Sequence, residues 1–567
     1  MASSNGAARP SDYPPPVDSV KEFVGPPTDS EDDRIEVGVA IVGGGPAGLA
    51  CANRLMQLLA DDEALAEALG EVPVAVIEKG KSCGAHNLSG AIMRPSAMKQ
   101  LFPDVPESEW PTQGEVPGEA VYLMLNRKRS LRIPTPPPFR NHGNYVISVA
   151  ELSRWLASKA EEAGAYILTE TSATKLLVED GVVRGVRSGD KGRGKQGEEL
   201  GNFEPGSDVV ARHTVLAEGT WGHLAGAAIG EFDLGSGDPQ EWALGVKEVW
   251  QVEQPLKKVI HTLGWPLRTG AKYKEFGGSW IYPMSDDKVS IGFVIGLNYS
   301  DAELSVHDVL QEFKLHPRIR GILEGGKRLS WGAKAIPEGG YWAIPKLSAP
   351  GMVICGDSGG MVNVSELKGI HYAMHSGIMA AEKIYSALKA GSTDVSSYDD
   401  AVHDSLIGKE LYATRNMKQP FAKGFFVGGA IVNAMVATKG RFPGGHWKTH
   451  HDADTPVFHG GRSASYPKPD GKYTFDKLSS VFITGNETRD DAPNHIRIEK
   501  HVPRELADMW KWMCPAGVYE VPDDAPAEGP VDVIVNYTNC VQCGAITAKG
   551  GRLTVPEGGD GPLYQVT

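Results

Sequence analysis

The stretch that decides the fold is VGVAIVGGGPAGLACANRLMQLLA, residues 37–60. Its first six residues form an apolar run that is typical of a buried strand, and residues 49–60 carry a helical pattern. Between them lies GGGPAG, a GxGxxG sequence at residues 43–48. A second strand pattern, VAVIEKG at 74–80, reaches Glu78 near its end. The order strand, glycine loop, helix, strand and acidic residue predicts a βαβ unit that binds a dinucleotide.

Each position of the loop has a physical reason in that interpretation. Gly43 permits the tight turn, Gly45 lets the backbone approach a pyrophosphate, and Gly48 lets helix and strand pack closely. Pro46 and Ala47 open the helix, whose amino terminus favours phosphate. Glu78 is expected to accept hydrogen bonds from ribose hydroxyls. A purely structural glycine turn is the alternative, but the strand, the helix and the acidic residue around the loop favour a nucleotide site.

Two further segments favour FAD over a nicotinamide. HTVLAEGTWGHLA (213–225) is a strand pattern followed by Gly219, and GMVICGDSGGMVNVSELKGIHYAMHSG (351–377) contains Gly356 and Asp357 before a helix. Asp357 can bond a ribitol hydroxyl, although a turn or cap role is the alternative. The amides after Gly369 open a helix whose amino terminus can stabilise negative charge on a flavin. A second fingerprint for NAD(P)H is not evident, which favours a protein or organic electron donor.

Composition narrows the functional class. The 567 residues carry a formal net charge of −14, which argues against nucleic-acid binding. Six cysteines in so long a chain do not make a disulfide scaffold. Three of them, Cys514, Cys540 and Cys543, lie near the carboxy terminus, which favours a metal site. In NYTNCVQCGAITAKGG (537–552), the position where a third thiol would extend the CxxC pair is Ile546.

The amino-terminal segment gives no targeting signal. Residues 1–35 are rich in Pro, Ser and Asp and lack both an apolar core and an Arg-rich pattern. We expect a disordered arm there. The chain has no apolar run of the roughly 18 residues that a spanning helix needs.

Seven ordered motifs carry a resemblance to a known family. They are GAHNLSGAIM (84–93), RNHGNYV (140–146), EGGKRLSWGAKAIPEGG (324–340), KGIHYAMHSGIMAAE (368–382), YPKPDG (466–471), CPAGVYE (514–520) and VPEGGDGP (555–562). From about residue 36 to its end the chain resembles the electron-transfer flavoprotein–ubiquinone oxidoreductases. The resemblance implies FAD, a [4Fe–4S] cluster, a quinone site and monotopic membrane attachment. Cofactors do the chemistry in such an enzyme, so no catalytic triad is expected, and His86, His142 and His371 are predicted to be packed or hydrogen-bonded.

The expected fold is α/β plus α+β. It combines a Rossmann-like FAD domain of the glutathione-reductase or hydroxylase type, a β-sheet quinone domain and a ferredoxin-like iron–sulfur domain. We expect the FAD domain to be discontinuous and the membrane to be contacted by two segments. The expected bounds are 36–120, 145–235 and 345–400 for the FAD domain, 121–144 and 400–455 for membrane contact, 236–344 for the quinone domain and 456–567 for the iron–sulfur domain.

Two segments are candidates for membrane and quinone contact. KGFFVGGAIVNAMVATKG (423–440) has 15 uncharged residues between its outer lysines, too few to span a bilayer but suited to dipping into one leaflet. A buried core helix is the alternative. NRKRSLRIPTPPPFR (126–140) is basic enough to meet anionic lipid or to be a solvated loop. By the resemblance, Gly277 and Gly278 contact the quinone, and Phe276 stands where the family has Tyr; a glycine turn before a strand is the alternative.

The resemblance also assigns Cys514, Cys540 and Cys543 as cluster ligands and places Ile546 at the fourth ligand position. Four-iron clusters normally use four thiolates. Four outcomes stay open: a [4Fe–4S] cluster with a non-cysteine ligand, a three-iron cluster, no cluster, or zinc held with a distant His. A second departure is Ser148, where family members often have Arg.

The resemblance implies an electron-transferring-flavoprotein dehydrogenase, which passes electrons from reduced electron-transfer flavoprotein through FAD to ubiquinone or menaquinone. It would link fatty-acid and amino-acid oxidation to the respiratory chain. The absent transit peptide predicts a bacterial protein, peripheral or monotopic on the cytoplasmic face of the cytoplasmic membrane. Two alternatives are a geranylgeranyl-reductase-like or hydroxylase-like FAD enzyme that uses NAD(P)H and has a degenerate cluster domain, and a membrane-bound electron-transfer adaptor without turnover.

Overall fold

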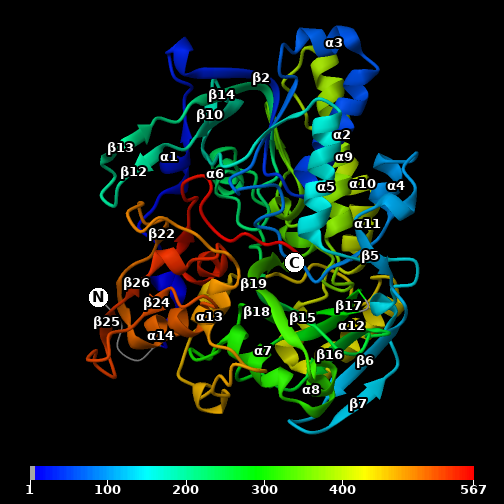
Figure 1. The fold of residues 1–567 in the computed structure, drawn as a ribbon, viewed down its shortest axis with the longest axis vertical. Helices are drawn as coiled ribbons and strands as arrows, with labels where there is room; N and C mark the ends of the chain where they lie inside the picture. The colour runs from blue at the N-terminus through cyan, green and yellow to red at the C-terminus, as the bar shows by residue number, and fades with distance from the viewer. Residues whose placement is uncertain (1–6, 286) are drawn as a thin grey trace.

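The computed structural model describes residues 7–285 and 287–567. Two large β-sheets, two small ones, the helices that pack on them and a carboxy-terminal module of short strands and helices make up the described chain (Figure 1). We use "flavin-side sheet" for the nine-stranded sheet that contains the GxGxxG loop, "second sheet" for the seven-stranded one, and "C-terminal module" for residues 456–567.

The flavin-side sheet begins from the predicted strand–loop–helix. Its parallel strands run in the order β21, β14, β2, β3 and β9, and β14 also pairs with β11 along its first residues. The strands are β1 (Val24–Gly25), β2 (Arg34–Val42), β3 (Val74–Ile77), β9 (Tyr166–Leu168), β10 (Ala173–Glu179), β11 (Val182–Ser188), β14 (Asp208–Leu216), β20 (Ser348–Ala349) and β21 (Met352–Ile354). β3, β20 and β21 are buried along their whole length and β2 is buried from Val37 to Val42, whereas β10 and β11 mix buried and partly exposed residues.

Three helices pack beside this sheet, α2 (Pro46–Ala60), α5 (Val149–Glu162) and α9 (Ile370–Ala390), and Figure 1 shows them side by side. α2 and α9 approach closely, because a Cβ on Gly377 would lie 2.1 Å from the carbonyl oxygen of Ala47. Ser148 caps α5 by accepting from the amide of Glu151 (3.3 Å), and its hydroxyl donates to the Thr567 carbonyl (3.2 Å). Ser148 therefore has a structural role in this chain.

The predicted disordered arm is wrong for residues 7–35; residues 1–6 lie outside the described residues. α1 (Ser19–Phe23) buries Phe23 against the ring of His223 (5.0 Å between centroids), and β1 adds a parallel strand to β10. Pro10 is buried, with its carbonyl oxygen packed against Gly550. A few apolar residues within a polar stretch are thus enough to order this segment on an existing surface.

The second sheet has the strand order β19-β15-β18-β17-β16-β6-β7 and is antiparallel except where β16 meets β6. Its strands are β6 (Glu119–Met124), β7 (Ser130–Ile133), β15 (Trp242–Gln251), β16 (Val259–Gly264), β17 (Gly277–Ser285), β18 (Lys288–Gly296) and β19 (Lys327–Pro337). Helix α7 (Val306–Lys314) packs on it, and Lys314 reaches Glu248 in a fully buried ion pair (2.7 Å). The hairpin β6–β7, most of which lies in the segment 121–144, forms one edge of this sheet.

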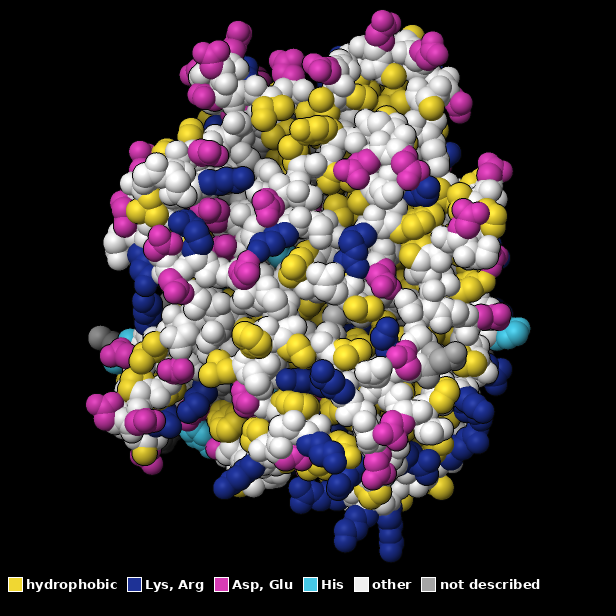
Figure 2. All heavy atoms as spheres, in the orientation of Figure 1, with side chains coloured by type: hydrophobic (Ala, Val, Ile, Leu, Met, Phe, Trp, Pro, Cys, Tyr) yellow, Lys and Arg dark blue, Asp and Glu magenta, His cyan; other side chains and the backbone are white. Residues whose placement is uncertain are grey.

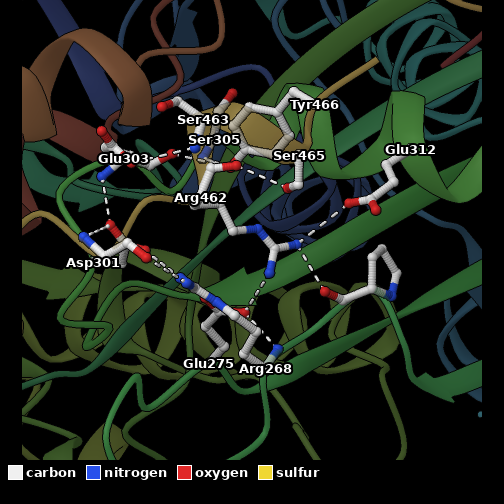
Figure 3. A network of polar contacts seen from close by, with 12 residues as sticks. Arg268, Glu275, Asp301, Glu303, Ser305, Glu312, Arg462, Ser463, Ser465 and Tyr466 are labelled. Atoms are coloured by element: carbon white, nitrogen blue, oxygen red, sulfur yellow. Dashed lines mark hydrogen bonds and ion pairs between the residues drawn. The ribbon is translucent and has the colours of Figure 1, made fainter. Parts of the chain in front are cut away.

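A buried charge network precedes β17 (Figure 3). Arg268 bonds Glu275 (2.6 Å) and Asp301, and Arg462 bonds the other oxygen of Glu275 (2.9 Å). The Glu275 and Asp301 carboxylates are fully buried, so each needs these partners. Arg462 comes from the C-terminal module, so the network joins that module to the segment that leads into Gly277.

The C-terminal module contains α13 (Lys477–Phe482), α14 (Arg504–Met513) and pairs of two- and three-residue strands. Trp510 and Met513 of α14 share one apolar core with Trp250 and Phe293 of the second sheet. The Trp510 indole also donates to the carbonyl of Lys549 (2.7 Å). This shared core holds the module rigidly against the second sheet.

The segment 423–440 forms α12 (Phe425–Ala437), which is 13 residues long. At about 1.5 Å per residue it covers roughly 20 Å, well short of a bilayer. Val432 and Met435 are buried, whereas Val427 is 52% exposed. No helix in the described parts of the chain is both long and apolar enough to cross a membrane.

Candidate functional site

A cavity of about 330 Å³ lies between the flavin-side sheet and the second sheet. The GxGxxG loop, Glu78 and the start of α9 line one side, and β15, β17, β18 and β19 line the other. Eight residues predicted to bind the cofactor line it: Gly43, Gly45, Pro46, Ala47, Glu78, Gly219, Asp357 and Gly369. The structure therefore brings three distant segments of the sequence to one cavity.

The three glycines of the fingerprint have separable roles. A Cβ on Gly48 would lie 2.1 Å from the Gly43 carbonyl oxygen, and one on Gly43, whose φ is +110°, would lie 2.3 Å from the Ala217 carbonyl. Both glycines are thus required by packing, and Gly48 does not line the cavity. A Cβ on Gly45 would meet nothing nearer than the Asn87 side chain at 3.5 Å. Gly45 is therefore dispensable for packing, and its missing side chain leaves room for a ligand.

Glu78 is fixed at the end of β3. Its carboxylate accepts from the amides of Gly44 (2.8 Å) and Gly80 (2.6 Å), and it faces the cavity. These two amides orient the acid next to the glycine loop, which is where a ribose attached to the bound pyrophosphate would lie.

The far end of the cavity is formed by Asp357 and the start of α9. Burial raises the pKa of Asp357 to about 6, with Lys334 acting in the opposite direction. Gly369 caps α9, so the first amides of this 21-residue helix open toward the cavity. Gly356 does not line the wall; a Cβ there would lie 3.0 Å from Ala47, so it is a packing residue.

Gly277 and Gly278 lie elsewhere. They begin β17, where a Cβ would lie 2.0 Å from the Val294 carbonyl at Gly277 and 2.7 Å from the Thr262 carbonyl at Gly278. Close strand packing therefore explains both glycines. The neighbouring Phe276 ring packs on Phe421, 4.5 Å between centroids, and Phe421 precedes α12. The pair thus borders the α12 segment rather than the flavin cavity.

Cys514, Cys540 and Cys543 line one small second pocket together with Ile546. Backbone amides lie within reach of two of the sulfurs: Val518 N at 3.4 Å from Cys514 Sγ and Gln542 N at 3.4 Å from Cys540 Sγ. Burial raises the pKa of the Cys543 thiol to about 12, so a bound metal is needed to hold it as thiolate.

The two pockets share a wall. Gln542, between Cys540 and Cys543, lines the flavin cavity, and Leu553 lines both pockets. Gln542 accepts from Lys79 Nζ (2.6 Å) through its side chain and from Lys334 Nζ (3.1 Å) through its carbonyl. Ala335 of β19, which lines the cavity, donates from its amide to the Cys543 carbonyl (2.8 Å). A single layer of residues, which includes Gln542 and Leu553, thus separates the thiols from the flavin cavity.

Lys79 and Lys334 were missed by the sequence analysis. Both line the cavity, and burial lowers their pKa, that of Lys79 to about 8. Two ammonium groups beside the cavity favour negative charge in either pocket. Lys79 follows Glu78 directly, and Gln542 lies between the two cysteines of the CxxC pair. Their position next to predicted ligands is the one feature of the sequence that could have identified them.

Two of the three histidines named from the sequence, His86 and His371, are buried. His86 lines the cavity, and burial lowers its pKa well below the usual range, as does its position near Lys79. Burial lowers the pKa of His371 to about 2. Both rings are therefore neutral, and His142 is exposed.

The lining residues fit the two implied cofactors to different degrees. The open position at Gly45, the fixed carboxylate of Glu78 and the start of α9 fit FAD. The three converging thiols fit three corners of a [4Fe–4S] cluster, in which each thiolate binds a different iron. Across the described residues, no three or more His, Cys, Asp or Glu side chains are grouped to hold one metal ion.

Two family profiles match the chain. One is described as "ETF-QO, ubiquinone-binding" and matches residues 242–336. The other is described as "Electron transfer flavoprotein-ubiquinone oxidoreductase, 4Fe-4S" and matches residues 471–565. The first covers most of the second sheet, and the second covers most of the C-terminal module, including all three thiols.

Curated relatives match over nearly the whole chain. The electron transfer flavoprotein-ubiquinone oxidoreductase of Pseudomonas aeruginosa is 38% identical over 94% of this chain and 99% of its own length. The mitochondrial protein of that name from Caenorhabditis elegans is 37% identical over 93% and 91%. A geranylgeranyl bacteriochlorophyll reductase-like structure from Thermoplasma acidophilum superposes with a TM-score of 0.54 at 17% identity, over 72% of this chain and 92% of that one, a likeness of fold alone.

Proposed function

The chain belongs to the electron transfer flavoprotein–ubiquinone oxidoreductase family, and we propose that it passes electrons from reduced electron transfer flavoprotein to a membrane quinone. Relatives with this name match 94% of its length at 35–39% identity. In that role it would connect the flavoprotein dehydrogenases of fatty-acid and amino-acid oxidation to the respiratory chain.

The observation that carries the proposal is the wall shared by the flavin cavity and the thiol pocket. Gln542 lines the cavity while its neighbours Cys540 and Cys543 line the pocket. A carrier in each pocket would be separated by one layer of residues, an arrangement that suits electron transfer and serves no purpose in a hydroxylase. When bound, FAD and the cluster supply the redox chemistry, and the protein holds, orients and tunes them.

The flavin-side residues would hold FAD by its two ends. The loop 43–48 and the start of α2 would take the pyrophosphate, and Glu78 the adenosine ribose. Asp357 would bond the ribitol chain, and the first amides of α9 would face the flavin ring. Gly219 is placed by Ser358, whose hydroxyl donates to its carbonyl (3.0 Å).

We further propose that quinone enters between β17 and α12. Phe276, Phe421 and Phe425 form an aromatic run from the start of β17 to the start of α12, with centroids 4.5 and 6.3 Å apart. Trp280 and Tyr282, further along β17, line the flavin cavity. An apolar quinone ring could follow these residues from the surface toward the flavin.

The membrane-facing surface in this proposal is the lower end of the molecule in Figure 2, where Lys and Arg gather. Figure 1 places β7 and α8 (Pro317–Leu323) there. Exposed cations come from both elements, and Arg318 Nε donates to Ser130 Oγ (2.9 Å), which joins them. The patch consists of Arg127, Lys128, Arg129, Arg132, Arg318 and Arg320, all exposed. It would bind anionic lipid while exposed apolar residues such as Val427 and Phe442 enter one leaflet.

The basic end stands out because the chain as a whole carries a formal net charge of −14. Acidic side chains crowd the opposite end in Figure 2. A surface of anionic lipid would therefore attract one end and repel the other, which orients the protein. We propose peripheral, monotopic attachment to a bacterial cytoplasmic membrane on its cytoplasmic face.

The test is anaerobic turnover of FAD-loaded protein in vesicles that contain quinone. We expect reduced electron transfer flavoprotein to drive quinone reduction and NADPH to drive none, and we expect binding to vesicles to rise with the fraction of anionic lipid. Flavin reduction by NADPH, with none by electron transfer flavoprotein, would contradict the function and favour the reductase or hydroxylase alternative.

A further inference from the structure

The thiol pocket offers three strong ligands and an apolar fourth side. Besides the three cysteines, its wall contains Ile546, Tyr519 and apolar or glycine residues. Among the residues that the structure describes, no carboxylate, imidazole or amide side chain lines it. A cubane cluster held at three corners would therefore turn its fourth iron toward a side that has no thiolate.

Ile546 is held firmly on that side. It is the second residue of the short helical turn Ala545–Lys549, is 5% exposed, and its carbonyl accepts from the Gly551 amide (3.0 Å). A Cβ on Gly551 would lie 2.5 Å from Ile546 Cγ1 and 2.8 Å from Ile498. The isoleucine side chain thus fills an apolar niche that fits it closely. This packing fixes the turn, so the turn does not move to place a different metal ligand there.

We propose that the cluster of this chain is bound by Cys514, Cys540 and Cys543 alone, and that the iron facing Ile546 carries an exchangeable ligand from solvent. The position would accept a small anionic ligand such as hydroxide, cyanide or a low-molecular-weight thiolate. This inference rests on the cluster in the proposed function and adds that one iron is labile and open to outside ligands.

Loss of the labile iron follows a balanced step. The [4Fe–4S]²⁺ cluster gives up one Fe²⁺ and one electron and becomes [3Fe–4S]⁺. Ferricyanide takes the electron and becomes ferrocyanide, and EDTA binds the released Fe²⁺. Adding Fe²⁺ and a reductant reverses the step. The three Cys–Fe bonds persist throughout.

The experiment uses the full-length protein, purified or reconstituted anaerobically with iron, sulfide and FAD. Ferricyanide with EDTA should release about one iron in four and produce the EPR signal of a three-iron cluster, and added Fe²⁺ should restore the starting spectrum. Cyanide added to the reduced cluster should shift its EPR spectrum, because the ligand binds directly to the open iron.

The matched variant is Ile546→Cys, which places a thiol on the fourth side, with Ile546→Val as its control. We expect Ile546→Cys to slow iron release roughly tenfold or more and to remove the cyanide shift, and Ile546→Val to behave as the wild type. Tyr519→Phe tests whether a phenolate fills the position; it should leave wild-type behaviour unchanged.

The outcomes separate this inference from the function beneath it. The inference would be overturned if the wild-type cluster keeps all its iron, shows no EPR shift with cyanide and releases iron as slowly as Ile546→Cys. The cluster itself would still stand. Iron exchange that appears only in Tyr519→Phe would also overturn it. Protein that binds no iron and sulfide, although it retains FAD, would refute the cluster itself, and flavin reduction by electron transfer flavoprotein is assayed separately.

Discussion

The flavin cavity and the thiol pocket share Leu553, and Gln542 of the cavity wall stands between two of the thiols in the chain, yet the two pockets are built from different chemical groups. In our proposal the cavity would bind FAD largely through backbone groups: a glycine loop, helix amino termini and a carboxylate that amides hold in place. The pocket depends on side-chain sulfur at fixed positions. A backbone site keeps its function while most side chains around it vary, whereas a side-chain site loses a ligand with one residue, as at Ile546.

The largest expected effect breaks the backbone site. Gly45→Ala builds into the cavity without meeting protein atoms closer than 3.5 Å, so the variant should fold. The added methyl occupies the space that the pyrophosphate needs, and FAD affinity should fall by about 100-fold or more. Flavin released on ultrafiltration measures the loss.

The control for that change is Gly25→Ala in β1, where a Cβ meets nothing within 4 Å. Iron content after reconstitution should stay at the wild-type level in both variants, because the thiol pocket does not use the glycine loop. If Gly45→Ala retains all of its FAD, the glycine loop is not part of the FAD-binding site.

The second prediction breaks the side-chain site instead. Cys540→Ser leaves two thiols, too few to retain a cubane cluster, and iron content should drop close to zero while FAD stays bound. Iron and sulfide analysis beside flavin absorbance measures both. If FAD is lost together with iron, the two pockets depend on each other for their structure and are not independent binding sites.

The third prediction concerns the wall itself. Lys334→Met removes a positive charge from beside the cavity and should lower the flavin midpoint potential by on the order of tens of millivolts. Lys327→Met, an exposed lysine of the same strand, is the control and should leave the potential unchanged. A redox titration of each holoprotein measures the flavin potential. Equal potentials in the wild type and both variants would show that Lys334 does not tune the flavin electrostatically.

The smallest effect lies away from both sites. His213 in β14 is 1% exposed, and its Nε2 lies 3.1 Å from the Ser392 carbonyl oxygen. Burial lowers its pKa to about 4. Between about pH 6.5 and 4 the unfolded chain binds the proton more tightly, so stability is complete above this range and falls as the pH falls.

At about pH 5.5 the loss from His213 should be about 1 kcal/mol. His213→Gln, which keeps a donor to Ser392 but does not titrate, should show a flatter dependence of its thermal unfolding midpoint between pH 7 and 5. A dependence as steep as that of the wild type would place the titrating groups elsewhere.

The flavin-side fold could be predicted from sequence because its signals are local. Residues 37–60 and Glu78 determine the strand–loop–helix–strand unit, and the family resemblance, the fold class and the cofactors agree with the matched profiles and relatives. The prediction of a disordered arm failed because a tertiary contact orders the segment: Phe23 packs against His223, two hundred residues later in the chain. Lys334 and Gln542 meet only in the folded chain, so spacing could not pair them.

Gly277 and Gly278 show a different limit. A glycine pair can serve ligand contact or strand packing, and sequence cannot tell which; here the Val294 and Thr262 carbonyls account for both. Their contact with quinone remains a proposal that depends on the aromatic run to α12. Ile546, in contrast, was visible in the sequence, but only the structure shows the apolar niche that its side chain fills.

The most direct test of the shared wall is a single-turnover experiment. Holoprotein is mixed anaerobically with substoichiometric reduced electron transfer flavoprotein, and flavin absorbance and cluster EPR are followed on freeze-quenched samples. The account predicts that flavin and cluster gain electrons in parallel, in proportions set by their potentials, at every time sampled. A flavin that becomes fully reduced while a cluster of equal or higher potential stays oxidised would contradict it.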